Sequence, residues 1–142
     1  MSLDTLVRTW FERVWNQQDG SAIDEMMSDE TIHHGLGGVG EDKVRGVDAF
    51  KEFHRNFLNA FPDLKFELEE TLFDDERIAI RYKLTATHSG EGIGIPATHN
   101  QIHIAGGGIG RAKDGRFTEV FNLIDFMTMY KQLGYTPALE KE

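Results

Sequence analysis

The order of apolar patterns along the chain predicts an α+β fold. The first half carries three stretches in which apolar residues recur at helical spacing, and the second half carries stretches in which apolar and polar residues alternate. Helices first and strands afterwards favour a layered structure in which a long helix packs into the concave face of a strongly curved antiparallel sheet. With 142 residues and no internal repeat, the chain is expected to form one domain, residues 1–142.

Three helices are expected in the first half. The first begins near Leu3, where Ser2 can cap it, and its apolar face consists of Leu6, Val7, Trp10, Phe11, Val14 and Trp15. Ser21 and Asp24 have the spacing of a capping box that opens a short second helix. The third helix carries Phe50, Phe53, Phe57, Leu58 and Phe61, and Pro62 ends it.

Strands follow. Residues 64–72 and 78–88 alternate as strands with one wet face do, and two further strands are expected over 101–111 and 117–124. The Asp-Gly pair between Lys113 and Arg116 favours a tight hairpin. Four glycines inside the third strand predict a bulge or a sharp bend where a backbone or ligand comes close: Gly106, Gly107, Gly108 and Gly110. A short amphipathic helix begins at Phe126, with Gly134 as its terminator.

Composition excludes several classes of function. The formal charge of −9 and the lack of a Lys/Arg cluster argue against a nucleic-acid partner. No apolar stretch approaches the roughly 20 residues that span a bilayer, so no membrane partner is expected. The first residues lack the basic and apolar segments of a signal peptide, and the chain has no cysteine, so we expect a cytoplasmic protein without disulfides or thiolate chemistry.

Several strings resemble, in their order and spacing, the SnoaL-like polyketide cyclase family of the nuclear transport factor 2-like superfamily. They cover almost the whole chain and read VWNQQD (14–19), HHG (33–35), FPDL (61–64), THSGEGIGIPAT (87–98), DGRFTEVFNLID (114–125) and QLG (132–134). The resemblance implies a cone-shaped α+β barrel with an apolar pocket between helices and curved sheet. It also implies a homodimer and chemistry without a cofactor.

The chain departs from the family strings at three positions. Phe121 replaces the Trp of the family's ExWxxxD string, and Ala97 and His99 replace a Pro and a Gly of its GIPPTG string. The pocket wall is therefore expected to differ from that of the cyclases, and Phe121 is a candidate substrate-binding residue. A polyketide substrate is not carried over.

Asp125 is the principal candidate for catalysis. In cyclases of the family an Asp at the end of the last strand is the acid/base of an intramolecular aldol closure, and the matching position here is Asp125. From the residues alone, two roles are open. On an unbroken strand, Asp125 shares a face with Phe121 and Leu123, and apolar surroundings would raise its pKa. It also precedes the helix at Phe126, where an N-cap role would lower its pKa instead.

Further candidates follow from the strings and from strand alternation. His34 and His88 can bind a substrate oxygen or orient Asp125, and Tyr82 lies on the same strand face as His88. The alternative for each histidine is a bond to a backbone carbonyl at a strand end. Adjacent His33 is expected to face solvent. Asn122 and Arg111 are candidate donors to a developing oxyanion, although Arg111 also suits a surface salt bridge.

The other histidines do not indicate a metal. His54 is expected at the edge of a helix's apolar face, and His103 can face either a pocket or an interface. His33, His34, His88 and His103 lack the short fixed spacings of a zinc site, and the resemblance implies no metal.

Three functions remain open. The first is a cofactor-independent acid/base enzyme, an aldol or ester cyclase, isomerase or hydrolase, acting on a small apolar carbonyl compound through Asp125. The second is a module that binds such a ligand without chemistry. The third is a dimeric scaffold in which the open face of the sheet pairs two copies.

Overall fold

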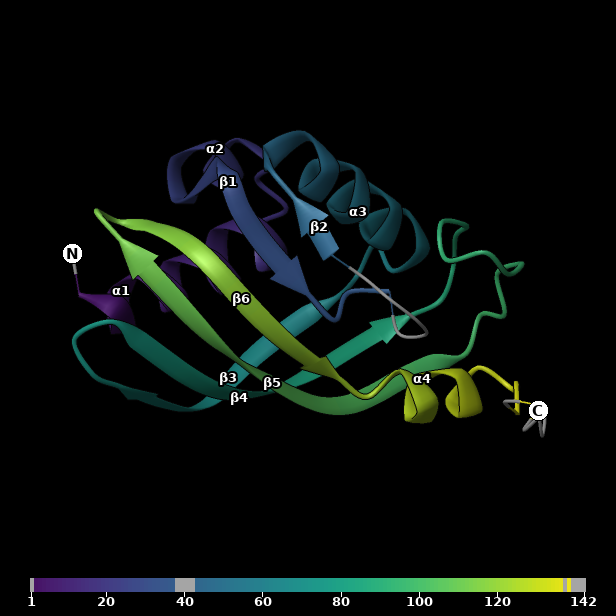
Figure 1. Cartoon of the computed structure of the whole chain (residues 1–142). Coiled ribbons are helices and arrows are strands. Elements are labelled where there is room, and N and C mark those ends of the chain that lie inside the picture. Colours follow the sequence, from purple (N-terminus) through teal and green to yellow (C-terminus); the bar gives the residue numbers. More distant parts are fainter. Residues whose placement is uncertain (1, 38–42, 137, 139–142) are drawn as a thin grey trace.

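A computed structural model describes residues 2–37, 43–136 and 138. The helical elements are α1 (Leu3–Thr9), η1 (Trp10–Asn16), α2 (Ser21–Met26), α3 (Val47–Ala60) and α4 (Phe126–Gln132). The strands are β1 (Met27–His34), β2 (Lys43–Arg45), β3 (Lys65–Phe73), β4 (Arg77–Thr87), β5 (Gln101–Lys113) and β6 (Arg116–Ile124). The α+β class and the order of its layers are as the sequence predicts (Figure 1).

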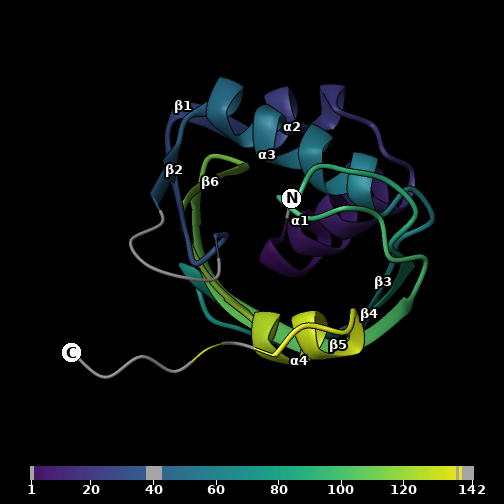
Figure 2. The same cartoon turned by 90° about the vertical axis from the view of Figure 1, so that its right-hand side faces the viewer.

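The strands form one six-stranded sheet in the order β2-β1-β6-β5-β4-β3. Seen end-on, the sheet curls around the helix that begins the chain, and α2 and α3 close the open side (Figure 2). The sheet is mixed where an antiparallel one was expected, because β1 runs parallel to β6. A parallel pair needs a long connection, and the segment from β2 to β5 supplies it.

The first helix changes its winding halfway. α1 is an α-helix, whereas η1 is a π-helix in which, for example, the amide of Gln17 donates to the carbonyl of Glu12, five residues back. This winding places Trp10 and Trp15 about one turn apart, and both are buried between the sheet and α3. His54 of α3 donates to the carbonyl of Val14 (2.7 Å), so a buried histidine joins the two long helical segments.

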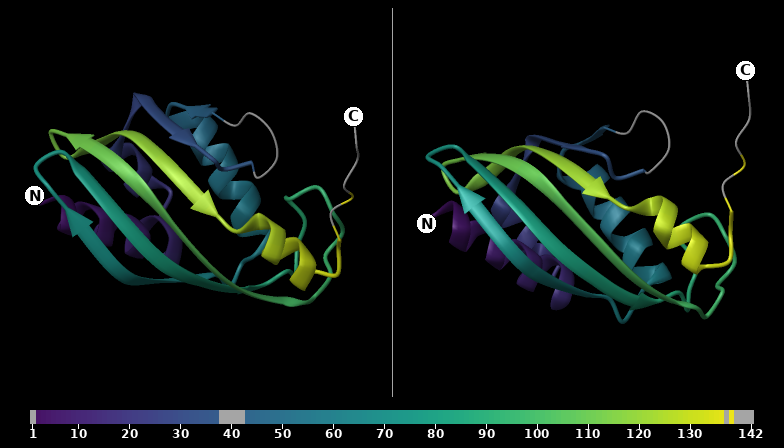
Figure 3. Two further views of the ribbon diagram at one scale, coloured as in Figure 1. Left: turned by 60° about the horizontal axis from the view of Figure 1, so that its bottom comes forward. Right: turned by 90° about the horizontal axis from the view of Figure 1, so that it is seen from below.

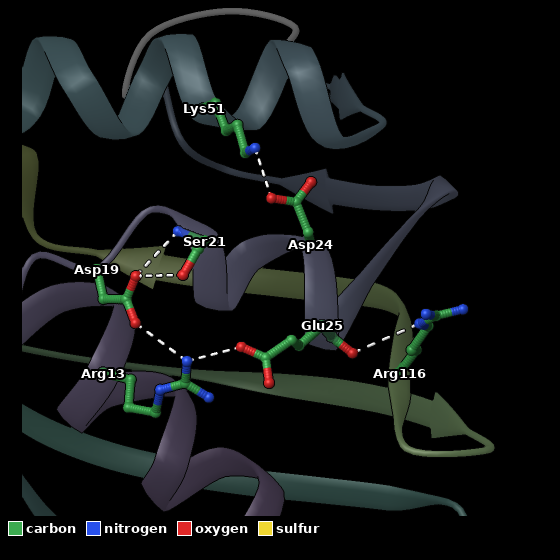
Figure 4. Close-up of polar contacts among 7 residues, drawn as sticks. All are labelled: Arg13, Asp19, Ser21, Asp24, Glu25, Lys51 and Arg116. Carbon is green, nitrogen blue, oxygen red and sulfur yellow. Dashed lines mark hydrogen bonds and ion pairs between the residues drawn. The ribbon is translucent and has the colours of Figure 1, made fainter.

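The helix caps only partly follow the prediction. Ser2 caps α1, since its hydroxyl accepts from the amide of Thr5 (3.1 Å). The capping box expected at Ser21 and Asp24 is not formed: Asp19 accepts from the amide of Ser21 (3.0 Å), and Asp24 pairs instead with Lys51 of α3 (2.6 Å; Figure 4).

A small ion-pair network fixes α2 against its neighbours. Arg13 of η1 pairs with Asp19 (3.0 Å) and with Glu25 (2.6 Å), and the Glu25 carbonyl accepts from Arg116 at the start of β6 (3.4 Å; Figure 4). The paired side chains are between 33% and 58% exposed to solvent, so the network orients α2 more than it stabilises the fold.

The glycine-rich strand is continuous, and no bulge interrupts it at the glycines. β4 pairs with β5 without a break from Arg77 opposite Arg111 to Thr87 opposite Gln101. The register shift lies later, between Arg111 and Ala112 in the β5–β6 ladder. The hairpin at Asp114 and Gly115 forms as predicted, with positive φ angles of 54° and 77°.

Helix α4 lies at one end of the sheet, beside β5 (Figure 3). The side chain of Gln132 accepts from the amide of His103 (2.8 Å) and donates to its carbonyl (2.9 Å), which ties α4 to the strand. Gly134, at φ 94°, ends the helix as expected.

Within the described ranges, no helix is long and apolar enough to cross a bilayer.

Candidate functional site

Two cavities lie between the helices and the concave face of the sheet, each with a volume of about 40 Å³. The first runs along the glycines of β5, and the second runs toward the phenylalanines of α3. The residues common to both are Trp10, Phe11, His33, Tyr82 and Asn122. Each cavity holds only a few water-sized molecules, so anything larger than that needs the two joined.

The cavity walls are mostly aromatic and aliphatic. Their polar side chains are His33, Tyr82 and Asn122, and none of the described lining residues carries a carboxylate, an ammonium or a guanidinium group. An apolar cavity with a few convergent polar groups is the usual form of a small-molecule site. The absence of a charged partner in the lining favours a neutral ligand, because a buried unpaired charge is expensive.

His33 of β1 is the most deeply buried polar residue that lines both cavities, at 2% exposure. Its ring packs on Phe50 (ring centroids 4.5 Å apart) and on Trp10 (5.8 Å). Burial, with a smaller contribution from neighbouring His34, lowers the pKa of His33 to about 3. The imidazole is therefore neutral at physiological pH. Its Nε2 atom is buried and has no hydrogen-bond partner among the described residues.

Asn122 of β6 holds the other edge of this ring. Its Nδ2 atom lies 2.9 Å from the carbonyl oxygen of His34 and 3.3 Å from Nδ1 of His33. These contacts need β1 and β6 to lie close together, and this depends on Gly35, at φ 80°. A side chain at position 35 would overlap the backbone carbonyl oxygen of Asn122.

Tyr82 of β4 is the third polar residue of the lining. Its ring lies over Gly106 of β5, where an added Cβ would sit 2.6 Å from the hydroxyl oxygen. Burial raises the pKa of Tyr82, so the phenol stays protonated. The lack of a side chain at Gly106 therefore leaves room for the Tyr82 ring on the concave face. This is the close approach that the glycines of the strand predicted.

Asp125 lies outside both cavities. It is exposed, and its carboxylate accepts from the amide of Thr128 (3.0 Å) and from its hydroxyl (2.7 Å), as an N-cap of α4 does. These bonds lower its pKa. Of the two environments that the sequence leaves open, the structure therefore has the cap. Strand β6 ends at Ile124, before Asp125, and the two residues expected on the same face as Asp125, Phe121 and Leu123, are exposed on the convex side of the sheet.

His34 and Phe121 also lie on the convex side. Their rings stack (centroids 4.4 Å apart), and Nε2 of His34 is 2.8 Å from the Glu119 carboxylate. The expectation that His33 faces solvent is wrong: His33 points inward and His34 outward. The sequence does not show which of the two histidines faces inward. The apolar residue before them, Ile32, lies on the outer face and is only half-buried.

His88 and Arg111 do not line either cavity. His88 follows β4, is fully buried against Phe61, and its Nδ1 accepts from the amide of Thr98 (3.2 Å), so it anchors the loop before β5. Its pKa is lowered, chiefly by burial. Arg111 is on the sheet surface, 3.6 Å from Glu76, in the surface ion pair that was the alternative for it.

The site that the structure assembles therefore contains two of the predicted residues, Tyr82 and Asn122, and adds His33 and Trp10. In the sequence, Trp10 was identified only as part of the apolar face of the first helix. Within the described part of the chain, no three His, Asp or Glu residues gather as a metal site would require.

Comparison with known proteins identifies the family. A family model described as SnoaL-like polyketide cyclase matches residues 5–133. No curated protein matches the chain.

Solved structures share the fold. A candidate SnoaL-like polyketide cyclase from Jannaschia sp. CCS1 superposes with a TM-score of 0.81 at 18% identity, covering 94% of this chain and 92% of that one. IdmH, a candidate polyketide cyclase from Streptomyces antibioticus, gives 0.79 at 22% identity, covering 93% and 98%. AclR, a candidate hydroxylase from Streptomyces galilaeus, gives 0.79 at 28% identity, covering 97% and 84%. The chain thus belongs to the SnoaL-like polyketide cyclase family.

Proposed function

We propose that this protein binds a small, neutral, mainly apolar carbonyl compound in the space between helix η1 and the curved sheet. The observation that carries the proposal is the buried Nε2 atom of neutral His33, which has no hydrogen-bond partner among the residues that the structure describes and lies in a mainly apolar lining. A buried polar atom without a partner costs about 1–3 kcal/mol, and a ligand oxygen at this position would recover part of that cost.

The size of the site limits the ligand. Each cavity alone is close to the volume of a few waters, but the two share Trp10, Phe11 and Tyr82 as part of a common wall. Phe11 is only half-buried, and a shift of its ring away from Phe66 and Tyr82 is the movement that we propose joins the two spaces. A one-ring ligand needs more space than the two cavities provide together, so its binding requires side chains of the lining to move.

A second candidate function, catalysis on the same ligand, is favoured by membership of a family named for cyclases. A neutral imidazole N–H aimed at a carbonyl oxygen stabilises the enolate that forms when a neighbouring carbon loses its proton. This step underlies aldol cyclisation and isomerisation alike. The role first assigned to Asp125, that of general base, requires its carboxylate to reach the ligand from the capping position.

The experiment uses acetophenone as a small carbonyl probe. We expect saturable binding to the wild-type protein, measured by calorimetry or by quenching of Trp10 and Trp15 fluorescence. His33→Phe keeps an aromatic ring against Phe50 and removes the N–H, so it should weaken binding about fivefold. Equal affinities, or no binding by a folded wild-type protein, would refute the proposal.

Catalysis is tested separately by NMR in D₂O. Exchange of the acetophenone methyl protons for deuterium, faster than in buffer, would establish enolisation, and binding without faster exchange would leave the protein a binding module. Asp125→Asn tests whether Asp125 is the base. If the variant binds acetophenone as the wild type does but no longer accelerates the exchange, Asp125 stays in the mechanism. If the exchange rate is unchanged, Asp125 is not the base.

We also propose that two copies pair through the convex face of the sheet. Four large apolar side chains are exposed there, on three strands: Leu72, Ile109, Phe121 and Leu123, hereafter the convex stripe. Exposed apolar patches of this kind on a sheet commonly mark an interface.

A further inference from the structure

We infer that Asn122 acts as a positioning residue: it fixes the tautomer of His33, so that the cavity presents a neutral N–H donor and selects uncharged ligands that carry a hydrogen-bond acceptor. The ligand class rests on the proposed function. The role of Asn122 does not, because it is built from contacts within the protein.

The first step is the orientation of the Asn122 amide. A backbone carbonyl can only accept a hydrogen bond, so the Asn122 atom that lies 2.9 Å from the His34 carbonyl oxygen must be the NH₂ group. The reversed amide would set two oxygens against each other. The geometry of β1 and β6 thus defines which end of the amide faces β1.

The second step passes from the amide to the ring. The same NH₂ group lies 3.3 Å from Nδ1 of His33, and its second hydrogen is available to that atom. Nδ1 must then carry a lone pair, which leaves the single proton of the neutral imidazole on Nε2. Both hydrogens of Asn122 are used in this way. Asn122 therefore acts on a ligand through His33 and is not itself the oxyanion donor that the sequence suggested.

The third step concerns what faces the ring. Phe50 and Trp10 pack against His33, and Tyr82 and Phe11 share the same cavities. No charged side chain among the described lining residues can balance an ionised ligand, so a carboxylate or an ammonium would be desolvated without compensation. A neutral molecule with a carbonyl, ether or ring nitrogen meets the Nε2–H without that cost.

The inference makes a definite chemical prediction for Asn122→Asp. A carboxylate has no hydrogen to give, so it would accept from Nδ1 of His33 and draw the proton there. Nε2 would become an acceptor, or the ring would become an imidazolium beside the new negative charge. One substitution therefore changes His33 from a neutral Nε2–H donor into either an Nε2 acceptor or a charged donor.

The tautomer can be measured without any ligand. Long-range ¹H–¹⁵N NMR of the imidazoles distinguishes the two neutral tautomers and the cation by their nitrogen shifts. We expect the Nε2–H form for His33 in the wild-type protein, and the Nδ1–H form or the cation in Asn122→Asp. His88 serves as an internal reference, because the amide of Thr98 donates to its Nδ1 and should keep it in the Nε2–H form in both proteins.

Asn100→Asp is the matched control. Asn100 also donates its amide hydrogen to a carbonyl, that of Gln132 (3.3 Å), but it is exposed and remote from His33. Its variant should leave the His33 spectrum unchanged. An Nδ1–H form of His33 in the wild-type protein would overturn the inference, whether or not Asn122→Asp folds. So would an identical His33 spectrum in folded Asn122→Asp.

The ligand class is tested with three probes of nearly one shape: acetophenone, α-methylstyrene, in which a CH₂ group replaces the carbonyl oxygen, and benzoate. The wild-type protein should bind acetophenone about fivefold more tightly than α-methylstyrene, and benzoate most weakly. In Asn122→Asp the preference for the ketone should vanish if the NMR shows the Nδ1–H form of His33, and it should remain if the NMR shows the cation, whose Nε2–H still donates. It should persist in Asn100→Asp.

The outcomes separate the two claims. Equal affinity for acetophenone and α-methylstyrene overturns the selection of acceptors. Failure of all three probes to bind overturns the proposed function and the ligand class with it, while the NMR measurement decides the role of Asn122 independently.

Discussion

At the scale of single residues, Asp125 illustrates how a side chain's role depends on where a strand ends and the next helix begins. Its neighbours Ile124 and Phe126 are half-buried, but its own carboxylate is exposed and caps α4 through Thr128. A cap is a property of the oxygen atoms, so Asn serves nearly as well as Asp, whereas Ala does not.

We therefore expect Asp125→Ala to lose about 1 kcal/mol of unfolding free energy and Asp125→Asn to lose much less. Urea denaturation followed by circular dichroism measures both. Acetophenone affinity should be the same in the two variants and the wild type, because Asp125 lines neither cavity. A variant with normal stability but abolished binding would show that the carboxylate reaches the ligand after all.

His33 makes the stability of the fold depend on pH. Its pKa is about 3 in the folded protein and ordinarily 6.5, so the unfolded chain takes up the proton first as the pH falls. The contribution of neutral His33 to the free energy of unfolding is complete above pH 6.5 and is lost progressively as the pH falls toward 3. Each extra proton bound by the unfolded chain changes that free energy by about 1.4 kcal/mol per pH unit.

The measurement is the unfolding free energy between pH 6 and pH 4, in the wild type and in His33→Phe. The variant should have a slope smaller by up to one proton, that is, by about 1.4 kcal/mol per pH unit. His54 and His88, whose pKa values burial also lowers, titrate in both proteins and cancel in the comparison. Parallel slopes would mean that His33 is not neutral and buried as described.

Residue patterns in the sequence could identify Tyr82 and Asn122 as site residues, but they could not identify His33. Strand alternation placed Tyr82 correctly, because β4 is long and its apolar face is unambiguous. His33 and His34 lie at the end of β1, where their facing is set by the parallel pairing with β6. That partner strand is more than eighty residues away in sequence, and no local pattern reports its register.

At the scale of elements, the glycines of β5 have distinct roles. A Cβ at Gly110 would lie 3.7 Å from Ile78 and Phe117, at ordinary contact distance inside the first cavity. A Cβ at Gly108, two residues earlier, would lie 2.7 Å from the backbone oxygen of Phe121. The sequence indicated a close approach at this strand but could not say which glycine needed it.

Gly110→Ala should therefore stabilise the protein by about 1 kcal/mol, since it buries a methyl group and restricts the unfolded chain. The same methyl occupies cavity space, so acetophenone should bind more weakly. Gly108→Ala is the matched control on the same strand, and it should lower the stability because the β6 backbone would have to move. Denaturation and calorimetry on both variants test this, and tighter probe binding to Gly110→Ala would contradict the assignment of the first cavity to the ligand.

At the scale of the whole molecule, the convex face combines two opposing features. The ladders place Leu72 opposite Ala79, Ala79 opposite Ile109, and Ile109 opposite Phe121, so an apolar row crosses four strands on the side away from the helices. Figure 3 shows this face largely uncovered by other elements. The chain also carries a net charge of −9, which opposes the approach of a second copy.

If the convex stripe pairs two copies, burial of apolar area must outweigh that repulsion, and salt should strengthen the dimer by screening it. Sedimentation velocity over a range of protein concentrations, at low and at moderate salt, is the measurement.

Leu123→Glu, at the most exposed position of the stripe (67%), should give a monomer. Asn56→Glu adds the same charge at an exposed site on α3, away from the convex face, and should remain dimeric. A wild-type monomer at every concentration, or a dimer that persists in Leu123→Glu, would contradict the pairing. A dimer that weakens with salt would instead point to contacts between charged groups, because apolar burial is not screened by ions.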